Sequence, residues 1–302
     1  SQPETLTERK PLMTRIITSL SEISESYDAL FCDLWGCVHD GLAPFAEAVA
    51  ALQAFRARGG TVMLVTNAPR PHAPVRRQLD RLGVPSDAYD GIATSGDSAR
   101  AAMLRGAVGE KVYFIGQPHD QDFFAPLELI ENPVTISQVP LEQAEGMVCC
   151  GPFDPLADPK EMRAQFLQAK TRGLKLLCAN PDIVVDRGET REWCAGALAK
   201  LYTEMGGESL YFGKPHPPIY DLARRRLQAL GKDIPDSRIL CVGDGILTDI
   251  DGAMGEDLDS LFITGGLAAR ETQTADQPDP KALMAYLTKE MRQPAYSIGK
   301  LR

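Results

Sequence analysis

Short apolar runs recur along this chain of 302 residues, and polar residues stand where the runs end. Residues 29–32 lead into Asp33, and residues 61–65 lead into Thr66. Runs without polar alternation indicate strands that are buried on both faces, as in a parallel sheet covered by helices. Segments with helical features separate such runs, near residues 45–58, 72–83 and 193–206. We therefore expect an α/β fold with a doubly wound parallel sheet.

The chain is long enough for more than one structural unit. Apolar spacing at the start predicts a helical extension over residues 1–25, and residues 26–96 with 191–302 form the predicted core. Residues 97–190 carry a helix near 159–172 and strands of their own, at 112–115, 134–139, 147–150 and 174–178. We expect this segment to be an inserted α/β unit. The apolar run at 210–213 is expected to return to the core sheet.

Composition excludes several classes of protein. A net charge of −9 opposes nucleic-acid binding, which requires clustered Lys and Arg. No run approaches the ~20 apolar residues of a membrane span, so we expect no membrane partner. The seven cysteines form no CxxC pair and mostly lie in apolar runs, which indicates a reducing compartment, the cytoplasm. A homodimer is compatible with the sequence.

Polar side chains recur where the predicted strands end: Asp33, Thr66, Lys214 and Asp244. In open α/β sheets, ligands bind outside the carboxyl ends of the strands. A carboxylate can attack phosphorus only where cations offset its repulsion from the phosphoryl oxygens. Mg²⁺ prefers oxygen ligands, which Asp33 and Asp244 can supply, and Lys214 adds the second cation.

Four segments carry a family resemblance: Asp-Leu-Trp-Gly-Cys-Val from Asp33, Thr66 after its strand, Gly-Lys-Pro-His-Pro-Pro around Lys214, and Val-Gly-Asp-Gly-Ile-Leu-Thr-Asp-Ile with Asp244 and Asp249. In this order they resemble the motifs of the haloacid dehalogenase (HAD) superfamily. The likeness to its class IIA members, the nitrophenylphosphatase and sugar-phosphatase-like hydrolases, extends over most of residues 29–267. It implies a Rossmann-like core with a C2-type cap at 97–190.

The resemblance also implies a role for each motif residue. Asp33 is the nucleophile that becomes phosphorylated, and Lys214 neutralises it and the transferred group. The Thr66 hydroxyl and the Asn67 backbone N–H bind the phosphoryl oxygens. Further roles implied by the resemblance concern the metal: Mg²⁺ is held by Asp33, Asp244 and the backbone carbonyl of Trp35, while Asp249 holds a metal-bound water or orients Lys214.

Trp35 departs from the family pattern. Phosphatases of this family carry Asp two residues after the nucleophile, as general acid and base, and Trp cannot transfer protons at neutral pH. Losing such a group commonly lowers the rate ~10²- to 10⁴-fold. Three interpretations stay open: His39 or Asp40 takes over; the leaving group needs no proton, as in an aryl, acyl or enol phosphate or a phosphonate; or the protein binds a phosphorylated ligand or Mg²⁺ without fast turnover.

The predicted function is Mg²⁺-dependent hydrolysis of a small phosphorylated metabolite through phospho-Asp33. The alternative is a catalytically weak or inactive HAD-fold protein that binds a phosphorylated ligand. Candidate substrate residues in the cap are Asn180, Asp182, Arg187 and Arg191, although a charged hairpin surface explains them equally well. A receiver domain is rejected because its acidic pair precedes the acceptor, and the glycine fingerprint of a dinucleotide-binding enzyme and the G-x-S-x-G elbow of a serine hydrolase are missing. A nucleophilic Cys37 lacks an evident activating context.

Overall fold

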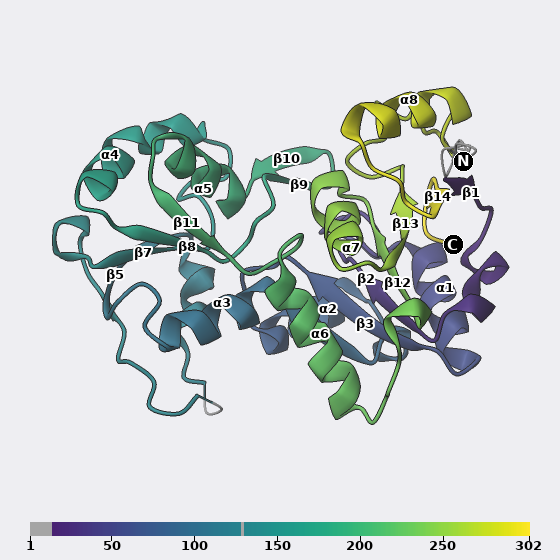
Figure 1. Cartoon of the computed structure of the whole chain (residues 1–302), viewed down its shortest axis with the longest axis horizontal. Coiled ribbons are helices and arrows are strands. Elements are labelled where there is room, and N and C mark those ends of the chain that lie inside the picture. Colours follow the sequence, from purple (N-terminus) through teal and green to yellow (C-terminus); the bar gives the residue numbers. More distant parts are fainter. Residues whose placement is uncertain (1–13, 128–129) are drawn as a thin grey trace, which may run out of the picture.

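Two parallel sheets lie side by side in the computed structural model, which describes residues 14–127 and 130–302 (Figure 1). The larger sheet has seven parallel strands, in the spatial order β1 (Arg15–Ile16), β14 (Tyr296–Ile298), β13 (Asp259–Ile263), β12 (Ile239–Gly243), β2 (Ala29–Cys32), β3 (Thr61–Thr66) and β4 (Gly91–Thr94). Every pairing is parallel, so the carboxyl ends of all these strands meet at one edge.

Helices cover both faces of this sheet. One face packs against α1 (Ala46–Ala57) and α2 (His72–Leu82). The other packs against α6 (Pro217–Ala229), with the short α7 (Asp251–Gly255) and α8 (Pro280–Glu290) beside it. Successive residues of β2 alternate between the two cores, because neighbouring side chains of a strand point to opposite faces. The predicted doubly wound fold is confirmed.

The second sheet has five parallel strands, in the order β11 (Glu208–Tyr211), β8 (Lys175–Cys178), β7 (Gly146–Cys149), β5 (Lys111–Ile115) and β6 (Ser137–Gln138). Helix α3 (Ser95–Leu104) packs on one face, and α4 (Arg163–Thr171) with α5 (Ala195–Glu204) packs on the other. An antiparallel hairpin of β9 (Val184–Arg187) and β10 (Thr190–Trp193) extends from this unit toward the larger sheet (Figure 1).

Short turns of other helical types complete the chain. They are the 3₁₀ segments η1 (Leu20–Glu22), η2 (Ser24–Ser26), η3 (Ser86–Ala88), η4 (Pro118–Phe124), η5 (Leu141–Gln143), η6 (Pro159–Met162) and η7 (Asp236–Arg238), and the π-helical segment η8 (Ile246–Ile250). Within residues 14–127 and 130–302, every helix is too short or too polar to span a bilayer. All seven cysteines are free and buried.

Three expectations need correction. Residues 14–26 form edge strand β1 and two 3₁₀ turns rather than a helix, while the rest of the predicted extension lies outside the described residues. The strand predicted at 134–139 shortens to β6. The run at 210–213, expected in the core sheet, instead contributes to β11, which pairs with β8. The second sheet therefore extends to Tyr211, and the end predicted for the inserted unit, residue 190, is too early.

Candidate active site

Lys214 is the buried cation of the site. It lies in the turn between β11 and α6, with only 3% of its surface exposed. Its Nζ donates to Asp33 Oδ1 at 3.0 Å, to Asp249 Oδ1 at 2.5 Å and to the Val65 carbonyl oxygen at 2.7 Å. An ammonium has three protons, so these acceptors use all of them. The ammonium is therefore held at a defined place beside the Asp33 carboxylate.

Asn67 holds the backbone around this ammonium. Its Oδ1 accepts from the Lys214 backbone N–H at 2.7 Å, and its Nδ2 donates to the Lys214 carbonyl at 3.0 Å and to Asp182 Oδ1 at 2.8 Å. The side chain of Asn67 thus links β3 to the segment that returns from the second sheet. Nearby, the buried Thr66 hydroxyl oxygen accepts from the Ala68 N–H at 3.2 Å, so its own proton can be donated elsewhere.

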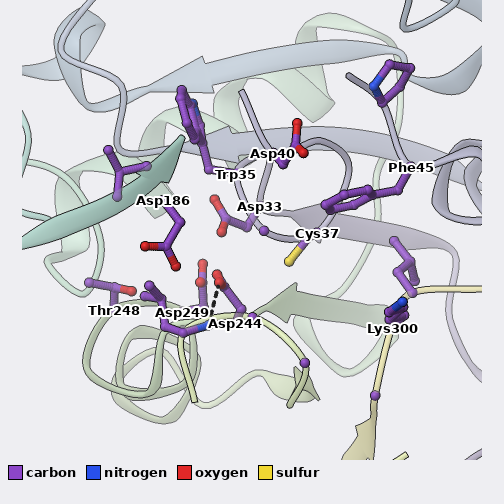
Figure 2. A pocket seen from close by; sticks show the side chains of 18 of the residues that line it. Asp33, Trp35, Cys37, Asp40, Phe45, Asp186, Asp244, Thr248, Asp249 and Lys300 are labelled. Carbon is purple, nitrogen blue, oxygen red and sulfur yellow. Dashed lines mark hydrogen bonds between the residues drawn. The ribbon is translucent and has the colours of Figure 1, made fainter. Parts of the chain in front are cut away.

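Acidic groups converge at the same edge of the sheet. One ligand atom each from Asp33, Cys37 and Asp244 lies within 4.8 Å of the others. Figure 2 shows these carboxylates and that of Asp249 around one space, with the Cys37 sulfur beside them. Asp244 Oδ2 accepts from the Leu267 N–H at 3.2 Å. This is the arrangement in which a small divalent cation can be bound by oxygen.

Backbone packing leaves the Asp244 carboxylate little freedom. Gly36 has a φ of +80°, and a Cβ added there would lie 2.3 Å from Asp244 Oδ2. A Cβ at Gly266 would lie at the same 2.3 Å from this oxygen. Both positions require glycine because the chain approaches the carboxylate so closely.

The charges in the site do not balance among themselves. Burial and the charge of Asp33 raise the pKa values of Asp244 and Asp249. Burial opposes the charged form of Lys214, but Asp249 and Asp33 outweigh it and hold the Lys214 pKa well above its usual range. With all three carboxylates ionised, one ammonium would leave a net negative charge, which a divalent cation would offset, so the donor set fits such an ion.

Asp249 contributes both of its oxygens to local structure. Oδ1 accepts from Lys214, and Oδ2 accepts from the Gly245 N–H at 3.1 Å. Of the two roles predicted for this residue, the contacts favour the orientation of Lys214. The Trp35 carbonyl oxygen, in contrast, accepts no hydrogen bond from the described part of the chain and is free to act as a ligand.

The Trp35 ring is packed into the loop that follows Asp33. A Cβ at Gly41, whose φ is +85°, would lie 2.3 Å from the ring. The His39 ring meets it edge-on at 5.2 Å, and the Arg187 guanidinium lies 5.0 Å from its centre. Trp35 lines the active-site cavity while binding these neighbours on its other sides.

Replacement of the missing acid-base group by His39 or Asp40 is one of the three interpretations left open by the sequence. His39 is buried, its Nδ1 accepts from the Gly41 N–H at 2.9 Å, and burial lowers its pKa to about 4. Asp40 borders the cavity, but its Oδ1 accepts from the N–H groups of Leu42 and Ala43 and caps its own turn. The geometry favours neither as a proton carrier.

The cavity above Asp33 has a volume of about 570 Å³. Asp182 and Asp186 line it from the second unit, and Lys300 lines it from the C-terminal segment. A separate hollow of about 550 Å³ contains Asn180 and Arg187. The four predicted cap residues are therefore not brought together, and Arg191 is an exposed partner of Asp186 rather than a lining residue of either cavity.

The sequence and fold match known proteins. A family profile described as haloacid dehalogenase-like hydrolase matches residues 30–129, and one described as HAD-hydrolase-like matches residues 211–289. A solved haloacid dehalogenase-like hydrolase from Brucella suis is 39% identical, has a TM-score of 0.82, and the alignment covers 95% of this chain and 100% of that one. The chain belongs to the haloacid dehalogenase-like hydrolases. The resemblance to the phosphatase-like class IIA group is confirmed.

Two curated relatives of this hydrolase carry the names of a nucleotidase and of a phosphatase. A 5′-nucleotidase of Bacillus subtilis is 25% identical over 266 residues, which cover 87% of this chain and 97% of the relative. A D-glycerol 3-phosphate phosphatase of Mycobacterium tuberculosis is 29% identical over 255 residues, which cover 82% of this chain and 66% of the relative. The same fold occurs in a solved glycerol phosphate phosphatase from M. tuberculosis in complex with magnesium. That structure is 24% identical with a TM-score of 0.64, and the alignment covers 93% of this chain and 77% of that one.

Some lining residues of this hydrolase had no signal in the sequence that pointed to the site. Cys37 could have been placed there, because it lies four residues after Asp33 in the same loop. Asp186 follows a short apolar pair in a charged segment, and only the position of the hairpin identifies it. Leu267 and Lys300 reach the cavity through loops at the far end of the chain, which no local pattern predicts.

Proposed function

We propose that this protein is a Mg²⁺-dependent phosphatase that hydrolyses a small phosphorylated metabolite through an aspartyl-phosphate on Asp33. The proposal rests above all on the Lys214 ammonium, which is fixed between Asp33 and Asp249 beside a second buried carboxylate. We further propose a cytoplasmic location, which agrees with the free cysteines, and a small phosphate ester as the ligand rather than a nucleic acid, which agrees with the acidic net charge.

In the first step, an oxygen of Asp33 attacks phosphorus, and the bond to the ester oxygen breaks as the leaving group takes its electron pair. Lys214 offsets the charge of the nucleophile and of the phosphoryl oxygens. The Thr66 hydroxyl and the Asn67 backbone N–H donate to the phosphoryl oxygens. Water then hydrolyses phospho-Asp33 and regenerates the carboxylate.

The residues that would hold Mg²⁺ are Asp33, Asp244 and the Trp35 carbonyl. The ion, when bound, supplies positive charge where the phosphoryl group and the nucleophile meet. The net negative charge of the carboxylates and the two glycine contacts that fix Asp244 support this assignment.

The cavity wall limits the substrate. Besides Lys214 and Lys300, the wall carries four carboxylates outside the proposed metal site, those of Asp40, Glu47, Asp186 and Asp276. Carboxylates repel a leaving group that bears further phosphates or carboxylates. A cavity of about 570 Å³ suits a small metabolite. We therefore expect the substrate to be a monophosphate with a neutral or amine-bearing leaving group. If this leaving group is an aryl or enol oxygen, it needs little protonation.

The test is phosphate release from p-nitrophenyl phosphate and from a panel of metabolite monophosphates, with Mg²⁺ or with EDTA. We expect release only with Mg²⁺, and none from Asp33→Asn. A faster reaction with an aminoalkyl monophosphate than with a bisphosphate of similar size supports the charge argument. Equal activity in Asp33→Asn contradicts the proposed nucleophile.

The alternative, a ligand-binding protein with slow turnover, draws on Trp35. Trp35 stands at the sequence position where phosphatases of this family carry the acid-base aspartate, and its ring packs against His39, Arg187 and Gly41. Trp35→Asp separates the two functions. If the site is otherwise complete, generic phosphatase activity rises in this variant, whereas an unchanged rate indicates a rebuilt or occluded pocket.

A further inference from the structure

The β9–β10 hairpin is fastened to the loop that follows Asp33. The Gly188 N–H donates to the Asp40 carbonyl at 3.0 Å, and the Arg187 guanidinium lies over the Trp35 ring at 5.0 Å. A guanidinium over an indole is among the stronger cation–π pairs. These two contacts fix the hairpin tip relative to the nucleophile loop.

Strand geometry then determines where Asp186 points. Neighbouring residues of a strand face opposite sides, so Asp186 faces away from the Trp35 contact of Arg187. Asp186 lines the cavity that contains Asp33, whereas Arg187 lines the other hollow. Figure 2 shows the Asp186 carboxylate directed into the same space as the carboxylates of Asp33 and Asp249.

Arg191 holds the Asp186 carboxylate from the opposite strand. Its Nε and Nη2 donate to the two oxygens at 2.8 and 3.0 Å, and the side chain of Asp186 remains 39% exposed. A carboxylate oxygen can accept a second hydrogen bond, so each oxygen can also take a water proton. A paired, accessible carboxylate is suited to act as a base rather than as an acid.

Four other acidic groups that line the cavity already have partners or an assigned role. Asp182 accepts from Asn67 Nδ2, and partial burial raises the pKa of its carboxyl. Asp40 caps its own turn. Asp244 and Asp249 are committed to the proposed cation and to Lys214.

We propose that Asp186 is the general base that replaces the missing aspartate at position 35, and that Trp35 positions it through Arg187. This inference rests on the proposed function. A water attacks the phosphorus of phospho-Asp33 and passes a proton to Asp186. The bond between phosphorus and the Asp33 oxygen breaks, and Asp33 keeps the electron pair. Inorganic phosphate leaves, and Asp186 releases its proton to solvent.

The experiment uses the full chain with Mg²⁺ and p-nitrophenyl phosphate, whose leaving group needs little protonation. In Asp186→Asn, we expect a burst of about one nitrophenolate per enzyme, followed by a steady-state rate at least ~10²-fold below that of the unchanged protein. Acid quenching and mass spectrometry should find phospho-Asp33 accumulated. A structural defect lowers the rate without this accumulation.

Glu192→Gln is the matched control. Glu192 forms the other cross-strand ion pair of this hairpin, to Arg187 Nε at 2.9 Å, but it faces the second hollow. We expect a rate within about twofold of the unchanged protein and no burst. Adding Trp35→Asp to Asp186→Asn should abolish the accumulation, because it restores a base.

The outcomes separate the two proposals. If phospho-Asp33 forms in the unchanged protein but does not accumulate in Asp186→Asn, at any rate of turnover, the result overturns only the role of Asp186. A burst in Glu192→Gln equal to that in Asp186→Asn does the same, since the effect then belongs to the hairpin. Absence of phospho-Asp33 in all variants overturns the proposed function as well.

Discussion

Removing the Lys214 ammonium tests whether the site is held together by charge. Lys214→Met keeps an unbranched side chain, one atom shorter, but removes the donor to Asp33 Oδ1, Asp249 Oδ1 and the Val65 carbonyl. Breaking a buried ion pair from one side costs about 3–5 kcal/mol of unfolding free energy, because a charge stays buried without compensation. We also expect phosphatase activity to fall at least ~10³-fold.

The effect should depend on pH in a defined direction. Burial and Asp33 raise the pKa of Asp249, whereas Lys214 lowers it, so removing the ammonium should raise this pKa further and make the folded state bind a proton more tightly than the unfolded state. Lowering the pH then relieves the buried charge. The loss of unfolding free energy in Lys214→Met should therefore be larger at pH 8 than at pH 5, as measured by urea unfolding in EDTA.

Lys300→Met is the control, since Lys300 lines the same cavity at an exposed position. We expect a change below about 0.5 kcal/mol. In a double-mutant cycle, Lys214→Met and Asp249→Asn should be non-additive by about 1–3 kcal/mol. A loss under 1 kcal/mol in Lys214→Met that is equal at both pH values, with additive effects in the cycle, refutes the reasoning.

Three further predictions concern the neighbouring residues. Gly36→Ala should lower kcat/KM at least ~10-fold and stability by about 1–3 kcal/mol, because φ is +80° there and an added Cβ would lie 2.3 Å from Asp244 Oδ2. Steady-state kinetics and urea unfolding measure the two effects, and an unchanged variant argues against the close contact. Burial lowers the pKa of His39 from 6.5 to about 4, so the unfolded state takes up a proton first as the pH falls. Between pH 7 and pH 5, the unfolding free energy should therefore fall by about 2 kcal/mol more than in His39→Asn, which keeps an acceptor for the Gly41 N–H. Mg²⁺ at 100 times its Kd should raise the unfolding free energy by about 2.7 kcal/mol, and Asp244→Asn should abolish this gain; equal stabilisation of both proteins by Mg²⁺ argues against the site.

The larger sheet and its polar strand ends could be predicted because both follow from local rules. Burial on two faces requires continuous apolar runs, and parallel strands place their carboxyl ends at one edge, so Asp33 and Asp244 meet there as predicted. Lys214 reaches the same edge from the turn after β11 of the second sheet, which the sequence had placed in the core. The contact that sets Asn67 against the Lys214 backbone depends on a return path from the second sheet. Its direction cannot be inferred from β3 alone.

The errors arise where two tertiary partners compete for one local pattern. The run 208–211 is equally suitable for either sheet, and only its register beside Lys175–Cys178 decides between them. Arg15 and Ile16 fit a helical spacing but pair with Tyr296 and Ser297 at the sheet edge. Long-range pairing of this kind overrides local propensity.

Position 35 illustrates how an active site can be changed without loss of its frame. An aspartate there would provide a proton carrier but no aromatic surface for Arg187. Trp35→Asp therefore has two opposing effects: it adds a base next to Asp33 and releases the hairpin that carries Asp186. In the Asp186→Asn background, release of the hairpin should lower the rate no further, because the base that the hairpin carries is already absent. A larger relative gain from Trp35→Asp in that background than in the unchanged protein is the result that the coupled roles of these residues require.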